Sequence, residues 1–265
     1  MDRYILEIVM KKSSSIKAAA VKLRDAIEKL TCCRIYIKPP IGVDLKADIL
    51  RLLPKYRPDT IIDVGANIGQ SARKFIEWFP HSMIYCFEPV SSTFSDLTKN
   101  LCQYSNIRCF QLALGKLQGK GKMRVDGSSL GASMLKADDI PPGATIEQVD
   151  LTTLDKFCEQ QRLGHISFLK IDTEGHDLDV LKGADNLLGN QKIDVIQVEA
   201  GMNPQNIWHV PIETLSTHLQ KRSYFLFGIY EQVNFWNYKE PHMLRSDPVF
   251  ISMRVIEQNR IRIRT

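Results

Sequence analysis

The stretch that most constrains this chain is residues 60–69, which read TIIDVGANIG. An apolar run ends in Asp63 and continues into a glycine-rich segment, which predicts a buried strand followed by a tight turn. Apolar residues at helical spacing come directly after the turn, and Pro80 closes the segment. A strand, a glycine turn and a helix in this order predict the opening of a nucleotide-binding α/β fold.

The residue types of the turn indicate what it could bind. Gly65 and Gly69 can adopt positive φ and let the backbone lie close to a ligand, and Asn67 tolerates the same conformation. The G-x-G-x-x-G spacing of dinucleotide sites is absent. Asp63 would repel a pyrophosphate but suits an ammonium group, such as the methionine end of S-adenosylmethionine. The alternative is that Asp63 and Asn67 only turn and cap the chain.

A second acid supports a nucleoside ligand. Residues 81–89, HSMIYCFEP, form another apolar run, and its acid, Glu88, lies 88 − 63 = 25 positions after Asp63. An acid near the end of the second strand is where nucleotide-binding folds hold the ribose hydroxyls. Two strand-end acids with this spacing favour a nucleoside cofactor over a chance pattern.

A second chemical centre follows the apolar run 166–171, where Asp172, Glu174, His176 and Asp177 crowd into one turn. One or two of these acids could simply cap the next helix and gain from its dipole. That interpretation does not account for a histidine among carboxylates at the carboxyl end of a central strand, where open α/β sheets place their ligands.

Five segments resemble the FkbM-type S-adenosylmethionine-dependent methyltransferases: DVGANIG (63–69), CFEP (86–89), LALG (112–115), TLDKF (153–157) and LKIDTEGHDLDVLKGA (169–184). The resemblance covers roughly residues 59–200, and its K-I-D-x-E-G block is the most specific part. It implies a Rossmann-like class I fold, with a mostly parallel sheet of about seven strands and an antiparallel edge hairpin. It also implies O-methylation of a sugar, glycolipid or natural-product hydroxyl.

The resemblance implies a role for several residues in holding the cofactor. Those expected at the methionine end are Asp63, Gly65, Ala66, Asn67 and Gly69, with Asp172 beside them, whereas Glu88 would hold the ribose and Ala113 and Leu114 the adenine ring. The last two could equally be ordinary apolar residues at the end of a strand.

Methyl transfer to a hydroxyl requires the acceptor to be aligned and its proton to be removed. We expect His176 to be the general base with Asp172 orienting it, or Asp172 to be the base itself. Glu199, a third strand-end acid, would line the acceptor pocket. The group Asp172, Glu174, His176 and Glu199 could instead hold a divalent cation, because carboxylates and imidazole suit such ions.

The remaining segments predict how the chain is divided into domains and where the protein is located. Residues 1–57 read as a helical N-terminal extension, which could cover the cleft or make a homodimer contact, and residues 58–265 as the methyltransferase domain. No apolar run reaches the roughly 20 residues that span a bilayer, and the chain does not start like a secretory signal. Six cysteines without C-x-x-C spacing agree with reduced thiols. We therefore expect a cytoplasmic protein without a membrane span.

Composition also limits the partners. The net charge is only +5, and no basic patch with interleaved aromatic residues is present, so a nucleic-acid acceptor is disfavoured. A small-molecule or glycan hydroxyl is the expected acceptor. Two other classes stay open: a nicotinamide-dependent oxidoreductase, which the missing glycine pattern argues against, and a non-catalytic nucleoside-binding module.

Overall fold

The computed structural model describes residues 14–31, 36, 39–125, 133–134, 145–234 and 241–260. The chain divides into two compact units, Met1–Pro40 and Ile41–Thr265. The first unit contains helix α2 (Ser14–Thr31). Helix α3 (Leu45–Leu52), which the sequence analysis assigned to the N-terminal extension, lies in the second unit and buries Leu45 and Ile49 in its core. The extension's suggested roles at a cleft or a dimer contact stay predictions.

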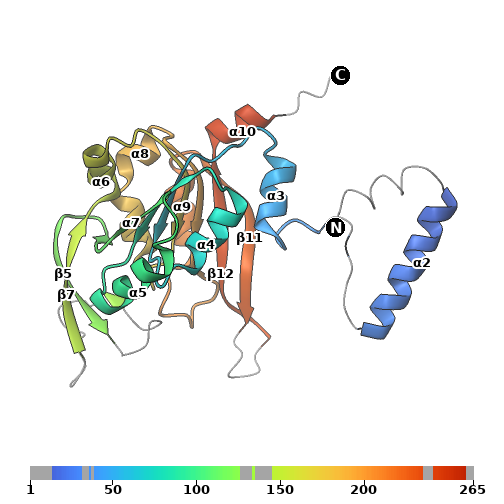
Figure 1. The fold of residues 1–265 in the computed structure, drawn as a ribbon, viewed down its shortest axis with the longest axis horizontal. Coiled ribbons are helices and arrows are strands. Elements are labelled where there is room, and N and C mark those ends of the chain that lie inside the picture. The colour runs from blue at the N-terminus through green and yellow to red at the C-terminus, as the bar shows by residue number, and fades with distance from the viewer. Residues whose placement is uncertain are drawn as a thin grey trace. The chain divides into compact units, whose positions relative to one another are not determined.

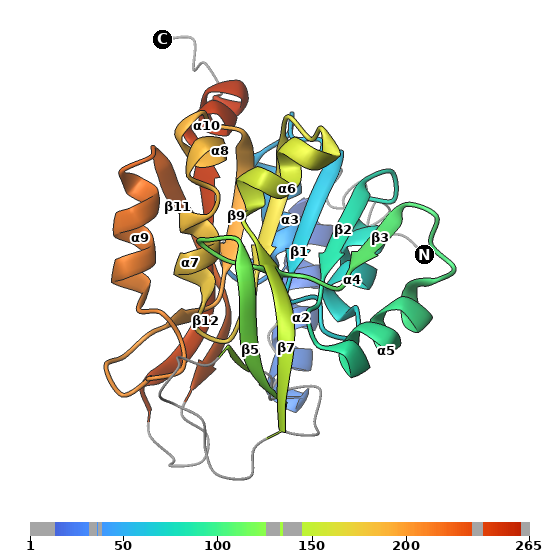
Figure 2. The same cartoon turned by 90° about the vertical axis from the view of Figure 1, so that its left-hand side faces the viewer.

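The second unit is built on one large sheet, with the strand order β10-β12-β9-β8-β1-β2-β3 and with β11 paired to β12 (Figure 2). The parallel strands are β3 (Ile107–Phe110), β2 (Met83–Phe87), β1 (Thr60–Val64), β8 (Ile166–Ile171) and β9 (Ile193–Val198). The antiparallel strands are β12 (Met243–Ser252), β11 (Tyr224–Asn234) and the short β10 (Ala200–Gly201). The expected mostly parallel sheet with an antiparallel edge hairpin is confirmed, with the two-residue β10 as an added strand.

Helices cover both faces of this sheet (Figures 1 and 2). One face packs against α6 (Leu154–Gln161), α7 (Asp177–Lys182), α8 (Asp185–Gly189) and α9 (Ile212–Gln220). The other packs against α3, α4 (Gln70–Trp78), α5 (Ser91–Leu101) and α10 (Met253–Asn259). Because both faces are covered, β8 and β9 are buried along their whole length and are mainly apolar, with two buried polar residues in each strand.

A second, smaller sheet follows β3 in the chain. It has the order β4-β7-β5-β6, from β4 (Ala113–Leu114), β7 (Thr145–Thr152), β5 (Gly119–Val125) and β6 (Ser133–Met134). Its own small core contains Ala113, Met123 and Val149. Both residues of β4 line the same cavity as Phe87 and Glu88 at the carboxyl end of β2.

No helix in the described ranges combines the length and the apolar character that crossing a bilayer demands.

Candidate active site

A cavity of about 330 Å³ opens at the carboxyl ends of β1, β2, β8 and β9. One half is lined by the turn after β1 and by neighbouring segments, with Gly65, Ala66, Asn67, Glu88, Ala113 and Leu114. The other half carries most of the charge, with Lys170, Asp172, Glu174, His176, Glu199 and Arg245. The two chemical centres of the sequence therefore share one cavity.

The turn after β1 has the backbone that its residues predict. Gly65 has a φ of +78° and Asn67 a φ of +50°. A Cβ on Gly65 would lie 1.9 Å from the carbonyl oxygen of Asp172, so the turn and the end of β8 pack backbone to backbone. Gly69 has a different role. It is the N-cap of α4 with a φ of +93° and packs against Leu101, and it is not among the residues that line the cavity.

Glu88 is held firmly at the end of β2. Its carboxylate accepts hydrogen bonds from the backbone N–H groups of Asn67 at 3.1 Å and Val90 at 3.0 Å. Burial raises the pKa of this carboxyl, although the two N–H donors oppose the shift. Glu88 thus links the turn after β1 to the segment after β2, and it faces the cavity where a ribose was expected.

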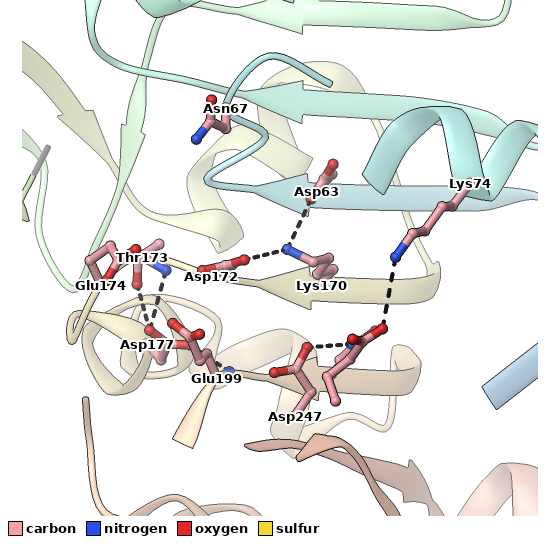
Figure 3. Close-up of polar contacts among 12 residues, drawn as sticks. Asp63, Asn67, Lys74, Lys170, Asp172, Thr173, Glu174, Asp177, Glu199 and Asp247 are labelled. Carbon is pink, nitrogen blue, oxygen red and sulfur yellow. Dashed lines mark hydrogen bonds and ion pairs between the residues drawn. The ribbon is translucent and has the colours of Figure 1, made fainter. Parts of the chain in front are cut away.

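Asp63 is not among the residues that line the cavity, and its expected contact with the cofactor stays a prediction. Its side chain is completely buried, and a carboxylate oxygen lies 3.8 Å from Nζ of Lys170 (Figure 3). Because side chains alternate between the two faces of a pleated strand, Asp63 points to the face of the sheet that is covered by α4. Burial raises the pKa of Asp63 to about 6, against the charge of Lys170.

Lys170 is the centre of a polar row across the sheet. Cys86, Asp63, Lys170 and Gln197 are register partners on β2, β1, β8 and β9. Nζ of Lys170 donates to Asp172 at 2.9 Å. Burial disfavours the ammonium, but the charges of Asp172 and Asp63 outweigh it and raise the pKa of Lys170.

This arrangement changes the role that Asp172 can have. Its burial favours protonation, but Lys170 outweighs that effect and lowers the pKa of Asp172. A carboxylate with a lowered pKa is a weak proton acceptor. Oδ2 of Asp172 accepts a hydrogen bond from Nζ of Lys170, so Asp172 holds that ammonium in position.

His176 lies on the cavity wall, at the N-cap position of α7. Glu174, two positions earlier, has a φ of +50°, which turns the backbone sharply at this point. Burial raises the pKa of the Glu174 carboxyl, and the neighbouring carboxylates of Glu199 and Asp172 act in the same direction. Two proton acceptors therefore face the charged half of the cavity.

Glu199 is paired with a histidine, but with a different one from that singled out by the sequence. Its carboxylate lies 2.9 Å from Nε2 of His209 and also binds Arg245. Nδ1 of His209 lies 3.0 Å from Oδ1 of Asn206, whose amide nitrogen donates to the carbonyl of Leu244. Oδ1 is thereby assigned as an acceptor, so Nδ1 of His209 carries a proton and Nε2 faces the carboxylate.

The ring of His209 is almost buried, with 8% of its side chain exposed. Burial favours the neutral ring, but the hydrogen bond and charge of Glu199 outweigh it and raise the pKa of His209. Sequence analysis missed this pair because the two residues lie ten positions apart (209 − 199 = 10) with β10 and a turn between them. No local periodicity marks such a contact.

The fold brings together some of the residues that the sequence predicted as ligands of a divalent cation. Ligand atoms of Glu174, Glu199 and His209 all lie within 4.8 Å of one another. This group keeps two members of the predicted set and has His209 in place of Asp172 and His176. Among the described residues, no other histidine, cysteine or carboxylate set meets the same spacing.

The fold and the cavity together define a Rossmann-like, S-adenosylmethionine-dependent methyltransferase. The chain matches the methyltransferase FkbM domain over residues 63–238 and belongs to that family. It is 28% identical over 177 residues to the hexuronic acid methyltransferase AglP of Haloferax volcanii, an alignment that covers 66% of this chain and 71% of the relative. It is 25% identical over 169 residues to the 2-O-methyltransferase NoeI of Sinorhizobium fredii, covering 57% and 67%.

A solved structure is also similar. It is that of M. capricolum TrmK with S-adenosylhomocysteine, at a TM-score of 0.44 and 10% identity, covering 77% of this chain and 67% of that one.

Proposed function

We propose that the protein transfers the methyl group of S-adenosylmethionine to a hydroxyl of a sugar or a similarly hydroxylated small molecule. The observation that carries this proposal is the division of one cavity into two halves. The half around Glu88, Ala113 and Leu114 has the buried acid and apolar residues that suit a nucleoside. The half between Asp172 and Arg245 has the alternating donors and acceptors that suit a polyol.

The cofactor is proposed to lie across the turn after β1. Gln70 and Ser71 line the cavity as the first residues of α4, and N–H groups at this position of a helix have no intrahelical acceptor. They suit the carboxylate of the methionine end. Glu88, which lines the cavity, is proposed to accept hydrogen bonds from the ribose hydroxyls, while Ala113 and Leu114 are proposed to contact the adenine. Asp63 is assigned an indirect role, because it acts on Lys170 beneath the turn.

His176 is proposed as the general base. The lowered pKa of Asp172 argues against the alternative that Asp172 takes the proton, so Asp172 is kept as the partner of Lys170. In this arrangement Glu199 is fixed by Arg245 and His209, and its position suits a hydrogen bond to a second hydroxyl of the acceptor.

The names of the two relatives support this acceptor. The hexuronic acid methyltransferase acts on an acidic sugar, and the 2-O-methyltransferase acts on an oxygen. Arg245 reaches the cavity with 35% of its side chain exposed and could meet the carboxylate of an acidic sugar. We propose neither a nucleic-acid acceptor nor a homodimer for this protein.

A divalent cation is proposed at Glu174, Glu199 and His209 as an accessory to acceptor binding. The proton on Nδ1 of His209 is held by Asn206, and histidine ligands commonly donate their second N–H in this way. Calorimetric titration with Mn²⁺ tests it. Saturable binding in the wild type that is lost in Glu174→Gln supports the site, and no binding by the wild type removes it.

The proposed function is tested by calorimetric titration with S-adenosylmethionine, with NADH alongside. We expect saturable binding of S-adenosylmethionine alone. Glu88→Gln should weaken it at least about tenfold, since a charged acceptor of ribose hydroxyls is lost. Glu159→Gln is the matched control, because Glu159 lies on the surface of α6 and pairs only with the nearby Lys156 in the described structure. A folded protein that ignores S-adenosylmethionine would overturn the proposal.

A further inference from the structure

A second cavity of about 790 Å³ lies between α4 and β11, beside the one described above. Its walls come from the segment that leads into α3, from α4, from the end of β11 and from the rim of the large sheet. All of these belong to the second unit of the chain. Its size is in the range of pockets that hold whole small ligands.

The two cavities meet at four residues. Ser71, Lys170, Asp172 and Arg245 line both of them. Figure 3 shows Lys170 with Asp172 at this junction; Asp247 lies on β12, which β9 separates from the strand of Lys170. A molecule whose reacting group lies at Asp172 can therefore extend into the second cavity without leaving the protein surface.

The lining of the second cavity is polar but balanced. It carries four cationic side chains, from Lys46, Lys74, Lys170 and Arg245, and four carboxylates, from Asp44, Asp172, Glu231 and Asp247. Gln197 and Gln232 add amide donors and acceptors. Because these charges nearly cancel, with Asp247 protonated or ionised, the lining does not strongly select a phosphate or a polycation, but it offers donors and acceptors to the hydroxyls of a polyol.

Three aromatic residues and one ion pair complete the site. Phe75 and Trp78 on α4 and Tyr230 on β11 line the walls; Phe75 and Tyr230 are buried, whereas Trp78 is only partly buried and offers apolar ring surface. Lys74 and Glu231 approach to 3.8 Å and connect α4 to β11 (Figure 3). Both partners are largely exposed, so this contact is weak enough to open for a ligand.

We propose that the second cavity is a binding site for a glycan chain, which holds the sugar residues next to the one whose hydroxyl is methylated. The inference rests on the proposed function for its reacting hydroxyl. It goes further by assigning an oligosaccharide, and not a free monosaccharide, as the molecule that fits the enzyme.

The test uses the chain of residues 1–265 loaded with S-adenosylhomocysteine and measures sugar binding by calorimetry. The probes are cellotetraose, chitotetraose and tetragalacturonic acid, each compared with its monosaccharide. Val43→Trp is the blocking variant, because Val43 lines the second cavity with 64% of the residue exposed, so a large ring there fills space without disturbing the core. Leu117→Trp is the matched control, since Leu117 is 67% exposed and lies on an unrelated surface groove.

We expect at least one tetrasaccharide to bind the wild type at least ten times more tightly than its monosaccharide. Val43→Trp should remove this advantage, and Leu117→Trp should keep it. S-adenosylmethionine should bind equally well to all three proteins. The inference is overturned if no tetrasaccharide binds the loaded wild type, or if Val43→Trp binds it as well as the control does. Failure of S-adenosylmethionine itself to bind would overturn the proposed function, a result that a separate titration of the unloaded protein with S-adenosylmethionine distinguishes from the others.

Discussion

His176 and Glu174 are the two groups on the cavity wall that compete for the role of base. They lie two positions apart at the end of β8, and the pKa of Glu174 is raised by its burial and by its acidic neighbours. A carboxyl with a raised pKa accepts a proton more readily near neutral pH. The geometry of the turn thus offers a histidine and a carboxylate to the same hydroxyl.

We expect His176→Asn to reduce kcat by about 10²-fold to 10⁴-fold, the usual range for loss of a general base, with S-adenosylmethionine binding unchanged. Glu174→Gln is the matched variant and should reduce kcat much less. The measurement is methyl transfer from labelled S-adenosylmethionine to the acceptor, with cofactor affinity determined separately. A larger loss in Glu174→Gln than in His176→Asn would assign the base to Glu174.

The buried carboxyl of Asp247 leads to a prediction about how the stability of the fold depends on pH. Burial raises its pKa to about 7, although Lys170 and the hydrogen bond from Gln197 oppose the shift. The folded state therefore holds a proton that the unfolded state has already released. The resulting stabilisation is complete below the ordinary pKa of 3.8 and is lost as the pH rises through about 7.

Asn at position 247 has no proton to lose and can still accept the hydrogen bond from Gln197. We expect Asp247→Asn to gain stability relative to the wild type between pH 4 and pH 7, by at most about 1.4 kcal/mol per pH unit. Urea unfolding at several pH values measures the difference in the free energy of unfolding. A difference that stays constant across this range would contradict the raised pKa.

Single residues also show what a sequence pattern can and cannot predict. The acids at the ends of β1, β2, β8 and β9 were found because an apolar run ending in an acid is visible locally. The face of the sheet to which each of these side chains points could not be predicted in this way. Asp63 is buried and is not part of the cavity lining. His209 joins the site by folding back on Glu199, a contact that no spacing along the chain encodes.

Among the secondary-structure elements, helix α6 shows how a capping residue determines where a helix begins. Thr153 precedes it, and its hydroxyl accepts a hydrogen bond from the backbone N–H of Lys156 at 3.1 Å. This satisfies one of the N–H groups that a helix start leaves without a partner. The helix packs Leu154 and Phe157 against the sheet, so its start is tied to the core.

We expect Thr153→Ala to destabilise the protein by about 1 kcal/mol, the usual cost of losing a capping hydroxyl. Thr153→Ser keeps the oxygen and should stay much closer to the wild type. Thermal and urea unfolding of the three proteins measure the difference. Equal losses in both variants would indicate that the methyl group of Thr153, and not its hydroxyl, carries the effect.

Elements with strong periodicity were predictable, and short ones were not. The strand, turn and helix from β1 to α4 follow directly from an apolar run, two glycines and helical spacing. The two-residue strands β4 and β10 exist only because neighbouring strands pair with them. Similarly, α3 reads as part of a helical lead-in, and only its packing against the core of the second unit reveals where it belongs.

The molecule as a whole consists of two units, and each is compact by itself. The core of the second unit lies on both faces of its sheet and is made from its own residues. The cavity and the second cavity are lined entirely by residues after position 41. The second unit therefore contains all of the described parts that the proposed reaction uses.

We expect a chain of residues 41–265 to unfold cooperatively with a melting temperature close to that of the full chain and to bind S-adenosylmethionine with the same affinity. Calorimetry of both chains measures the two quantities. A fragment that fails to fold, or that binds the cofactor more than about tenfold more weakly, would show that the first forty residues take part in forming the site.

The position of β12 has a consequence for how the chain is made. This strand lies between β9 and β11 in the sheet, yet it is the last strand of the described chain to leave the ribosome. Until residues 243–252 emerge, one edge of β9 has no antiparallel partner, and an open edge of this kind can pair with other chains. Folding of the methyltransferase unit is thus completed only after residues 243–252 have emerged, when β12 closes the sheet and brings Arg245 to the rim of the cavity.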